Sequence, residues 1–236
     1  MADGPSSELH ALGAEIVACR ACPRLVEWRE LVASEKRAAF RGDVYWGRPV
    51  PGFGDPAATV LVVGLAPAAH GGNRTGRVFT GDRSGDWLFG ALHRAGFANQ
   101  ATSVGVDDGL ELRGVYVAAA VRCAPPANRP TPAERDRCLP YLARELALLE
   151  RVRVIVVLGG FAYDAMARIL GETSSELPRP RPRFGHGVEV ATKRATILCC
   201  YHPSQQNTFT GRLTETMLDG VFRRAAELGG KVRSRS

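Results

Sequence analysis

Four cysteines in this sequence are spaced so that they could hold a metal. Cys19 and Cys22 form a C-x2-C pair near the N-terminus, Cys123 follows a predicted strand, and Cys138 lies in the first turns of a predicted helix. Four converging thiolates suit either a zinc ion or a [4Fe–4S] cluster. Structural zinc more often uses two C-x2-C pairs and this chain has one, so the spacing favours iron–sulfur. Four unrelated buried cysteines are the alternative.

The stretch from Gly64 to Asp82 reads GLAPAAHGGNRTGRVFTGD and directly follows an apolar run. Glycine lacks a Cβ, so the backbone of such a loop can approach a ligand closely. It matches neither the P-loop nor the dinucleotide-binding fingerprint. Asn73 could orient a water or a base edge, and Phe79 could stack on a base. A turn asparagine and a core phenylalanine are the alternatives.

A second polar segment follows the last apolar run of the chain, where His202 and Pro203 begin it. Pro203 fixes the turn, and the polar residues after it have no core to fill. A lone histidine is more often structural, but this context favours a functional role for His202. We expect phosphate and base contacts from Ser204, Gln205, Gln206, Asn207 and Arg212.

Four apolar, non-alternating runs suit strands that are buried on both faces of a parallel sheet. They are Thr59–Gly64, Val115–Val121, Arg153–Leu158 and Ala195–Tyr201. Cys199 and Cys200 lie inside the last run, where cysteine packs as a small hydrophobic residue. Ligands of open parallel sheets bind at the carboxyl ends of strands, so the glycine-rich loop and His202 meet if their strands are neighbours.

Helical patterns lie between these runs, most clearly in Pro132–Val152. Thr131 can cap this helix, and Glu134 completes a capping box. Strands alternating with helices predict the α/β class, with a three-layer α/β/α sandwich around a central four-stranded parallel sheet. We expect one domain over 1–236, an exposed loop over Leu177–Phe184, and flexible tails over 1–7 and 229–236.

The formal net charge is +7 and the isoelectric point is near 9.4, which favours a polyanionic partner. The N-terminus lacks the positive and apolar regions of a signal peptide, and the longest apolar run is far below the roughly 20 residues of a membrane span. We therefore expect a soluble, cytoplasmic protein. Six cysteines in such a compartment do not predict a disulfide framework.

Together these segments resemble the uracil-DNA glycosylase superfamily, specifically family 5, the iron–sulfur-containing UDGb type. The resemblance covers nearly all of the chain. It implies an α/β/α sandwich, one [4Fe–4S] cluster, and excision of uracil from double- or single-stranded DNA. It also implies a wider substrate range that includes deaminated purines such as hypoxanthine. The matching segments are YWGRPVPGFGD (Tyr45–Asp55), GLAPAAHGGNRTGR (Gly64–Arg77), FTGD (Phe79–Asp82), VRCAPP (Val121–Pro126) and HPSQQNTFTGRLT (His202–Thr214).

The resemblance assigns roles to particular residues. Phe79 matches the base-stacking aromatic residue, His202 the histidine near the uracil carbonyl, and Asn73 a polar residue that helps to position water. The cluster ligands would be Cys19, Cys22, Cys123 and Cys138, and the substrate loop would contain Gly64, Leu65, Ala66, Pro67 and Ala68. The chain departs from related families because GLAPAA carries no carboxylate or amide. It also has Ala119 where many relatives carry Asn.

These residues support hydrolysis of a flipped-out nucleotide, in which His202 stabilises negative charge on the departing base and Asn73 orients water. The cluster is expected to be structural and remote from both loops, and the chain to be a monomer. A non-catalytic module that binds damaged DNA is the alternative function. A radical iron–sulfur enzyme is disfavoured because the C-x3-C-x2-C signature is missing.

Overall fold

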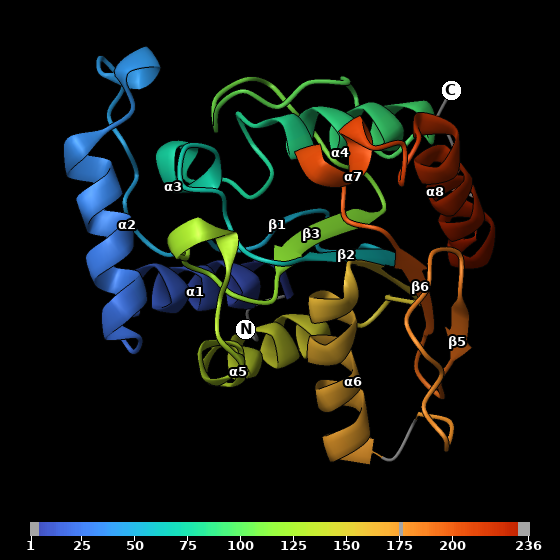
Figure 1. The fold of residues 1–236 in the computed structure, drawn as a ribbon. Coiled ribbons are helices and arrows are strands. Elements are labelled where there is room, and N and C mark those ends of the chain that lie inside the picture. Colours follow the sequence, from blue (N-terminus) through green and yellow to red (C-terminus); the bar gives the residue numbers. More distant parts are fainter. Residues whose placement is uncertain (1–4, 175–176, 231–236) are drawn as a thin grey trace.

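The computed structural model describes residues 5–174 and 177–230 of the chain (Figure 1). A single sheet of six strands, in the order β1-β3-β2-β4-β6-β5, forms its centre. The four inner strands are parallel to one another. They are β3 (Val115–Ala119), β2 (Val60–Gly64), β4 (Val154–Leu158) and β6 (Thr196–Cys200). Each coincides with one of the apolar runs, and nearly all of their side chains are buried.

The predicted four-stranded parallel sheet is thus confirmed as the centre of a larger, mixed sheet. Two short strands extend it at the edges, β1 (Phe53–Gly54) beside β3 and β5 (Glu189–Ala191) beside β6, and both run antiparallel to their neighbours. The prediction of four strands missed them because strands of two or three residues leave no readable periodicity. The edge strands lengthen the sheet without changing its parallel centre.

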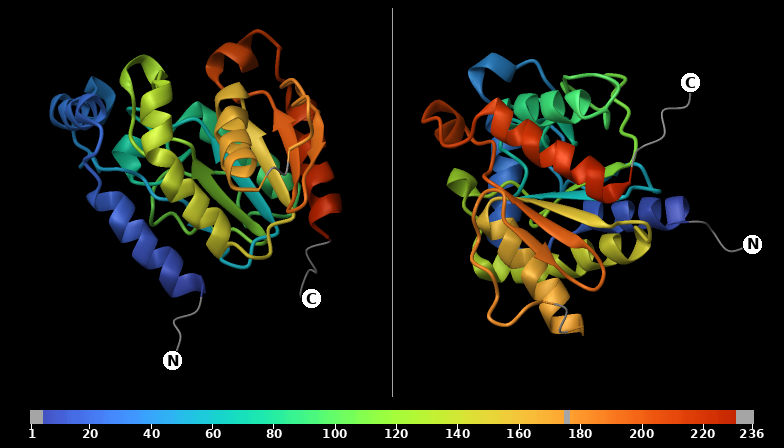
Figure 2. Two further views of the ribbon diagram at one scale, coloured as in Figure 1. Left: turned by 90° about the horizontal axis from the view of Figure 1, so that it is seen from below. Right: turned by 90° about the vertical axis from the view of Figure 1, so that its right-hand side faces the viewer.

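Helices cover both faces of the sheet, which confirms the three-layer sandwich (Figures 1 and 2). On one face α4 (Arg83–Arg94) and α8 (Glu215–Gly229) bury apolar side chains against Val60 and Val62. On the other face α5 (Pro132–Leu148) and α6 (Gly160–Ser174) pack against Leu61 and Val63. Because successive strand residues point to opposite faces, each inner strand serves both cores.

Helix α5 begins as predicted, with the side chain of Thr131 accepting from the backbone of Glu134 and the reciprocal bond also present. It ends at Leu148, four residues before the predicted end. Two N-terminal helices were not predicted: α1 (Pro5–Ala18), which packs against α5, and α2 (Pro23–Glu35), which lies beside the short α3 (Gly72–Thr75). The remaining helical segments are short: α7 (Gln205–Phe209) and the 3-10 turns Ala38–Phe40 and Pro126–Asn128.

The ends of the chain differ in part from the predicted tails. Residues 5–7 belong to α1 and Gly229 belongs to α8, while residues 1–4 and 231–236 lie outside the described residues. The segment Leu177–Phe184 contains no helix or strand, and Tyr163 of α6 donates a hydrogen bond to the carbonyl of Pro182 within it at 2.7 Å. Within the described ranges, no helix combines the length and the apolar character that crossing a bilayer requires.

Candidate active site

The carboxyl ends of three parallel strands bring the two predicted loops together. β2 ends at Gly64 and opens the glycine-rich loop, β4 ends at Leu158, and β6 is followed at once by the segment that carries His202. Gly159 has φ +96°, and a Cβ at this position would lie 3.4 Å from the Cβ of His202. The strands of the two loops are not neighbours, because β4 lies between them, but the parallel order β2-β4-β6 still places both loops at one edge of the sheet.

Phe79 covers the end of β2 and faces His202. The phenyl ring is so close to Gly64 that a Cβ there would lie 2.5 Å from its Cζ atom, so only glycine fits beneath the ring. The ring centroids of Phe79 and His202 are 6.0 Å apart, with 32° between the planes. Two side chains that are 123 positions apart in the sequence therefore border one space. That juxtaposition is what a site for a flat heterocycle needs.

The backbone at Phe79 is held in an unusual conformation. Its φ is +55°, in the left-handed region that residues other than glycine rarely adopt, and its side chain is only 8% exposed. Such a conformation persists only where the surroundings over-determine it. The carbonyl of Phe79 lies where a Cβ on Gly85 would have to be, at 1.8 Å, so α4 packs tightly against this turn.

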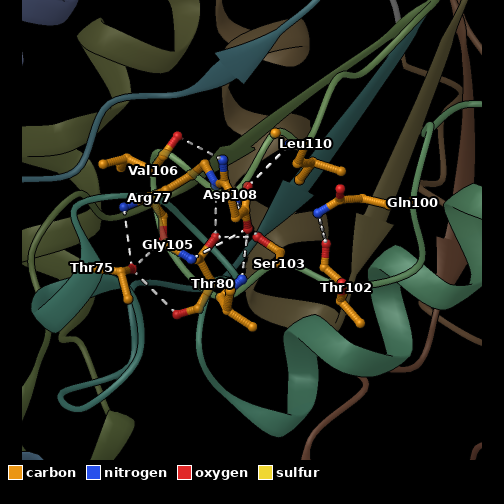
Figure 3. A network of polar contacts seen from close by, with 12 residues as sticks. Thr75, Arg77, Thr80, Gln100, Thr102, Ser103, Gly105, Val106, Asp108 and Leu110 are labelled. Atoms are coloured by element: carbon orange, nitrogen blue, oxygen red, sulfur yellow. Dashed lines mark hydrogen bonds and ion pairs between the residues drawn. The ribbon is translucent and has the colours of Figure 1, made fainter.

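A buried polar network holds the turn from the other side (Figure 3). Arg77 donates from Nη2 to Asp108 at 2.6 Å and to Ser103 at 2.7 Å, and from Nε to the hydroxyl of Thr80 at 3.0 Å. The hydroxyls of Thr80 and Ser103 are 2.7 Å apart. Arg77 and Thr80 flank Phe79 closely in sequence, so the network fixes the strained residue between two anchored neighbours.

The charge of Asp108 is essential to this network. Burial by itself would raise the pKa of the carboxyl, but hydrogen bonds from Arg77 and from the backbone of Val104, Leu110 and Gly105 lower it to about 2. The Arg77–Asp108 ion pair is buried on both sides. Because the carboxylate accepts several charge-assisted bonds, it stays ionised at neutral pH and orders the loop Val104–Leu110 against the glycine-rich loop.

His202 is neutral at physiological pH. Burial lowers the pKa of its imidazole to about 4, well below the ordinary value of 6.5. Among the described residues, none forms a hydrogen bond with the ring, so its nitrogens are available to a ligand. A neutral imidazole offers one N–H donor and one acceptor. The ring can therefore donate to an anion without bringing a full positive charge into the site.

The segment after His202 folds back on itself. The amide of Asn207 donates to the carbonyl of His202 at 2.9 Å, and Ser204 caps α7 through its hydroxyl, so both residues position the loop from within. Gln205 and Gln206 are exposed on α7 and can reach a partner. The guanidinium of Arg212 lies over the ring of Tyr201, 4.7 Å from the centroid.

An exposed aromatic residue in this segment was not singled out from the sequence. Phe209, at the end of α7, is 67% exposed, and the guanidinium of Arg83 lies 4.6 Å from its ring centroid. Arg83 is the first residue of α4, four positions after Phe79. Phe209 and Arg83 thus place an aromatic ring and a positive charge together at the surface.

Asn73 is completely buried, on α3. Its amide nitrogen donates to the backbone carbonyl of Arg29 on α2 at 3.1 Å. This partner is an acceptor, so the orientation of the amide is fixed and Oδ1 is the free end. Oδ1 has no hydrogen-bond partner among the described residues. The backbone N–H of Asn73 donates to Ala68, which ties α3 to the GLAPAA turn.

The first residues of the glycine-rich loop are anchored to the segment after β3. The carbonyls of Gly64 and Leu65 accept hydrogen bonds from the N–H groups of Ala120 and Val121 at 2.9 and 3.0 Å. Ala119 is buried and is the register partner of Gly64. Its methyl group is therefore the only side chain that β3 presents at this register, next to the predicted substrate loop. Pro67 packs against Gly72, since a Cβ added to Gly72 would lie 3.0 Å from the Cβ of Pro67.

The four cysteines singled out from the sequence gather in one small region. Cys22, Cys123 and Cys138 are buried in a common cluster with Leu25 and Val121, and Cys19 is partly buried at its rim. Burial raises the pKa of Cys123 to about 12, and the nearby charges of Cys138 and Cys19 add to this. Cys199 and Cys200 lie apart, buried in β6 as predicted. All six are free thiols.

The surroundings of the four cysteines bear on what they could hold. No set of three or more His, Cys, Asp or Glu residues within the described ranges is close enough to hold one metal ion. Two donors already point at the sulfurs: Arg29 donates to Sγ of Cys123 at 2.9 Å, and the backbone N–H of Arg122 interacts with Cys138. Such N–H···S contacts stabilise anionic thiolates.

The expectation that the cysteines lie far from both loops is wrong for the glycine-rich loop. Ala66, in the GLAPAA turn, packs directly against the cysteine cluster. Asn73 is linked through the carbonyl of Arg29 to the helix whose side chain reaches Cys123. The sequence does not reveal this proximity, because α2, which follows the N-terminal cysteine pair, packs beside α3 only in the folded chain.

Known proteins match most of this chain. The family model described as the uracil DNA glycosylase superfamily matches residues 51–226. The protein named type-5 uracil-DNA glycosylase of Mycobacterium bovis is 55% identical over 229 residues, which cover 96% of this chain and 84% of the relative. The chain belongs to the type-5 family of this superfamily. The type-5 uracil-DNA glycosylase of Thermus thermophilus is 51% identical, with 91% of this chain and 95% of the relative covered.

More distant members of the superfamily share less of the chain. The type-4 uracil-DNA glycosylase of Archaeoglobus fulgidus is 31% identical over 183 residues, which cover 77% of this chain and 82% of the relative. In this type-5 chain, the superfamily match begins after Cys19 and Cys22, whereas the type-5 relatives align over nearly the whole length. The N-terminal cysteine pair therefore lies outside the part that matches the superfamily model.

Proposed function

We propose that this chain hydrolyses the N-glycosidic bond of uracil in DNA. The observation that carries the proposal is the pair formed by Phe79 and His202, 6.0 Å apart at the carboxyl edge of the sheet. A pyrimidine that stacks on the phenyl ring would present its carbonyl edge to a neutral N–H donor. The type-5 relatives carry the name of this activity over nearly the full length of the chain.

The proposed reaction begins with a nucleotide that has rotated out of the duplex, because the bond between C1′ and the base cannot be reached inside the helix. As that bond breaks, both of its electrons remain on the base and positive charge develops on the sugar. The N–H of His202 donates to the base oxygen on which the negative charge accumulates. Water then adds to C1′ and loses a proton to the solvent, and the departed uracil anion takes up a proton from the solvent, which leaves an abasic site and free uracil.

Asn73 is proposed to orient this water through Oδ1. The amide nitrogen is occupied by the carbonyl of Arg29, and the oxygen is a buried acceptor that still lacks a partner among the described residues. Such an acceptor is satisfied by a water hydrogen. Bond cleavage precedes attack in this reaction, so a strong base is not needed. The absence of a carboxylate in GLAPAA is then consistent with catalysis.

The proposed substrate range extends beyond uracil, to hypoxanthine and other deaminated bases. A phenyl face stacks on any base, and the buried methyl group of Ala119 offers no hydrogen bond that would select one base edge. Phe209 and Arg83 are proposed to contact DNA where the nucleotide leaves the helix, since an exposed aromatic side chain can fill the gap in the stack. Single strands, which need no flipping from a pair, are proposed substrates as well.

The four cysteines, Cys19, Cys22, Cys123 and Cys138, are proposed to hold one [4Fe–4S] cluster. The donor set is four thiols, and Cys22, Cys123 and Cys138 lie in an apolar cluster. Arg29 of α2 donates an N–H group to Cys123. When bound, the cluster would join the N-terminal segment to the loop and helix that carry Cys123 and Cys138. The chain is proposed to act as an intracellular monomer, because one copy carries every residue of the proposed active site and of the four-cysteine site.

A cleavage assay with defined oligonucleotides tests the proposal. Purified chain is incubated with labelled strands that carry one uracil, hypoxanthine, xanthine or thymine mismatch, in duplex and single-stranded form, and abasic sites are revealed by alkali. We expect cleavage at uracil and slower cleavage at hypoxanthine. Tight binding to uracil-containing duplex without any abasic product would contradict the proposal and favour a non-catalytic damage-binding module.

A further inference from the structure

Arg29 is a buried arginine that touches both the cysteine site and the glycine-rich loop. Its side chain is 1% exposed and lies on the inward face of α2. Nη1 donates to Sγ of Cys123 at 2.9 Å, and Nη1 and Nη2 reach the carbonyl of Cys19 at 3.3 Å. Its own carbonyl accepts from the amide of Asn73 at 3.1 Å. One residue therefore contacts two cysteine segments and the residue proposed to orient water.

The guanidinium of Arg29 has one carboxylate partner among the described residues, and it shares that partner with a second arginine. Its nearest carboxylate is that of Glu30, which is half exposed, 3.7 Å away, and already paired with Arg20. Nε of Arg29 has no hydrogen-bond partner among the described residues. A buried cation is costly when its counter-charge is half exposed and shared with another cation. Ionised cysteine ligands at this site would supply that charge.

The path from the cysteines to the loop is short and consists of packed, buried atoms. α2 begins directly after Cys22 and packs beside α3, which holds Asn73. Ala66 of the GLAPAA turn packs on the same cysteine cluster. If loss of the bound metal shifted α2, the carbonyl of Arg29, which orients Asn73, would move with it. Contiguous buried contacts of this kind can transmit a coupling free energy in both directions.

We propose that Arg29 is a positioning residue that couples the four-cysteine site to the glycine-rich loop. The guanidinium stabilises the anionic thiolate site, and the carbonyl fixes Asn73 so that Oδ1 faces the reacting water. The role of the Arg29 carbonyl in orienting Asn73 rests on the proposed function, whereas the role of the guanidinium concerns only the cysteine site. By reciprocity, a change at Asn73 alters the stability of the cysteine site, and a change at Arg29 alters the loop.

Iron release from the purified, iron-loaded protein tests the coupling independently of catalysis. Loss of the visible absorbance is followed after addition of an iron chelator. Arg29→Gln is expected to release iron on the order of tenfold faster than the unaltered protein, because a hydrogen bond from a charged donor to a ligand is lost. Arg29→Lys keeps the charge without the forked geometry and should give an intermediate rate. Arg41→Gln removes an exposed positive charge that follows α2 in the sequence and should leave the rate unchanged.

Asn73→Ala supplies the reciprocal arm. It lies outside the cysteine site, so a purely catalytic residue would not affect iron release, whereas coupling predicts release that is at least twofold faster. In single-turnover cleavage, the double variant Arg29→Lys with Asn73→Ala should be no slower than Asn73→Ala alone, because residues that act through one contact are not additive. If Arg29→Gln does not fold, Arg29→Lys and Asn73→Ala still decide the matter.

Two results would overturn the inference: iron release from Arg29→Lys and Asn73→Ala at the rate of the unaltered protein, or equally rapid release from Arg41→Gln. Protein that lacks glycosylase activity but shows the coupled iron release would refute the proposed function and leave the coupling intact. Active protein without the coupled release would do the reverse. The two failures are therefore distinguishable.

Discussion

Replacement of His202 by alanine removes the proposed donor to the departing base. The structure sets the size of the expected loss. The imidazole has a pKa of about 4 because it is buried, so at pH 7 it acts as a neutral donor with a single N–H. No described residue competes for that hydrogen. One well-aimed donor to developing charge is worth about 3 kcal/mol, which corresponds to roughly 150-fold in rate.

Single-turnover cleavage of a uracil-containing duplex, with enzyme in excess, measures this loss at the chemical step. The control is His93→Ala, which removes an exposed histidine near the end of α4. We expect His93→Ala to retain full activity. We expect Asn73→Ala to lose less than His202→Ala, since water orientation follows bond cleavage. Equal losses in the two variants, or a larger loss in Asn73→Ala, would refute this ordering.

The pH dependence of the same variant tests the protonation state. If His202 titrated near 6.5, the ratio of unaltered to His202→Ala rates would change as pH falls through 6.5, because the donor would become an imidazolium. With its pKa near 4, the imidazole stays neutral and the ratio stays constant from pH 8 to pH 6. A step in the ratio near pH 6.5 would contradict the neutral donor.

Three further predictions concern other parts of the molecule. Phe209→Ala should slow cleavage of duplex DNA about tenfold while leaving single-stranded uracil nearly unaffected, because only the duplex has a stack to fill; equal effects on both substrates would exclude this role. Asp108→Asn should destabilise the fold by about 2 kcal/mol at pH 7 in urea unfolding, since the folded-state pKa of about 2 lies below the ordinary value of 3.8. This difference should shrink as pH falls from 4 toward 2, and a pH-independent difference would count against it. Cys138→Ser should yield protein with little iron, whereas the matched change Cys200→Ser should keep the full content; similar iron contents would refute the ligand assignment.

The parallel centre of the fold was predictable because its strands are buried on both faces. Such strands consist of uninterrupted apolar residues, as in Val60–Gly64 and Val154–Leu158, and each is followed by a loop at the same edge. Helix α5 was predictable from its capping box. The edge strands β1 and β5 were not, because pairing with a neighbour creates them and their composition does not.

Helix α2 was missed for a reason that bears on its function. Its buried face contains Leu25, Val26, Arg29 and Val32, so a charged residue interrupts the apolar stripe. Arginine is rarely buried, and the sequence pattern does not show that the sulfur of Cys123 accepts a hydrogen bond from Arg29. The signal that could have found Arg29 is its position, one helical turn before Val32 and two turns after Cys22.

The site was predictable in its residue types and much less in its geometry. Aromatic and histidine side chains that follow parallel strands of one sheet indicate a shared site, as with Phe79 and His202, although β4 lies between their two strands. The positive φ of Phe79 and the buried ion pair of Arg77 with Asp108 depend on tertiary packing. Likewise, full burial of Asn73 follows from its bond to Arg29, which comes from a helix 44 positions away.

The most direct test is a crystal structure of the chain with duplex DNA that carries a 2′-fluoro deoxyuridine, whose glycosidic bond resists cleavage. The account predicts that the uracil ring lies outside the duplex, stacked on the phenyl ring of Phe79, with a carbonyl oxygen within hydrogen-bond distance of the imidazole of His202. A uracil that remains in the base stack, or one bound where neither side chain touches it, would contradict the account.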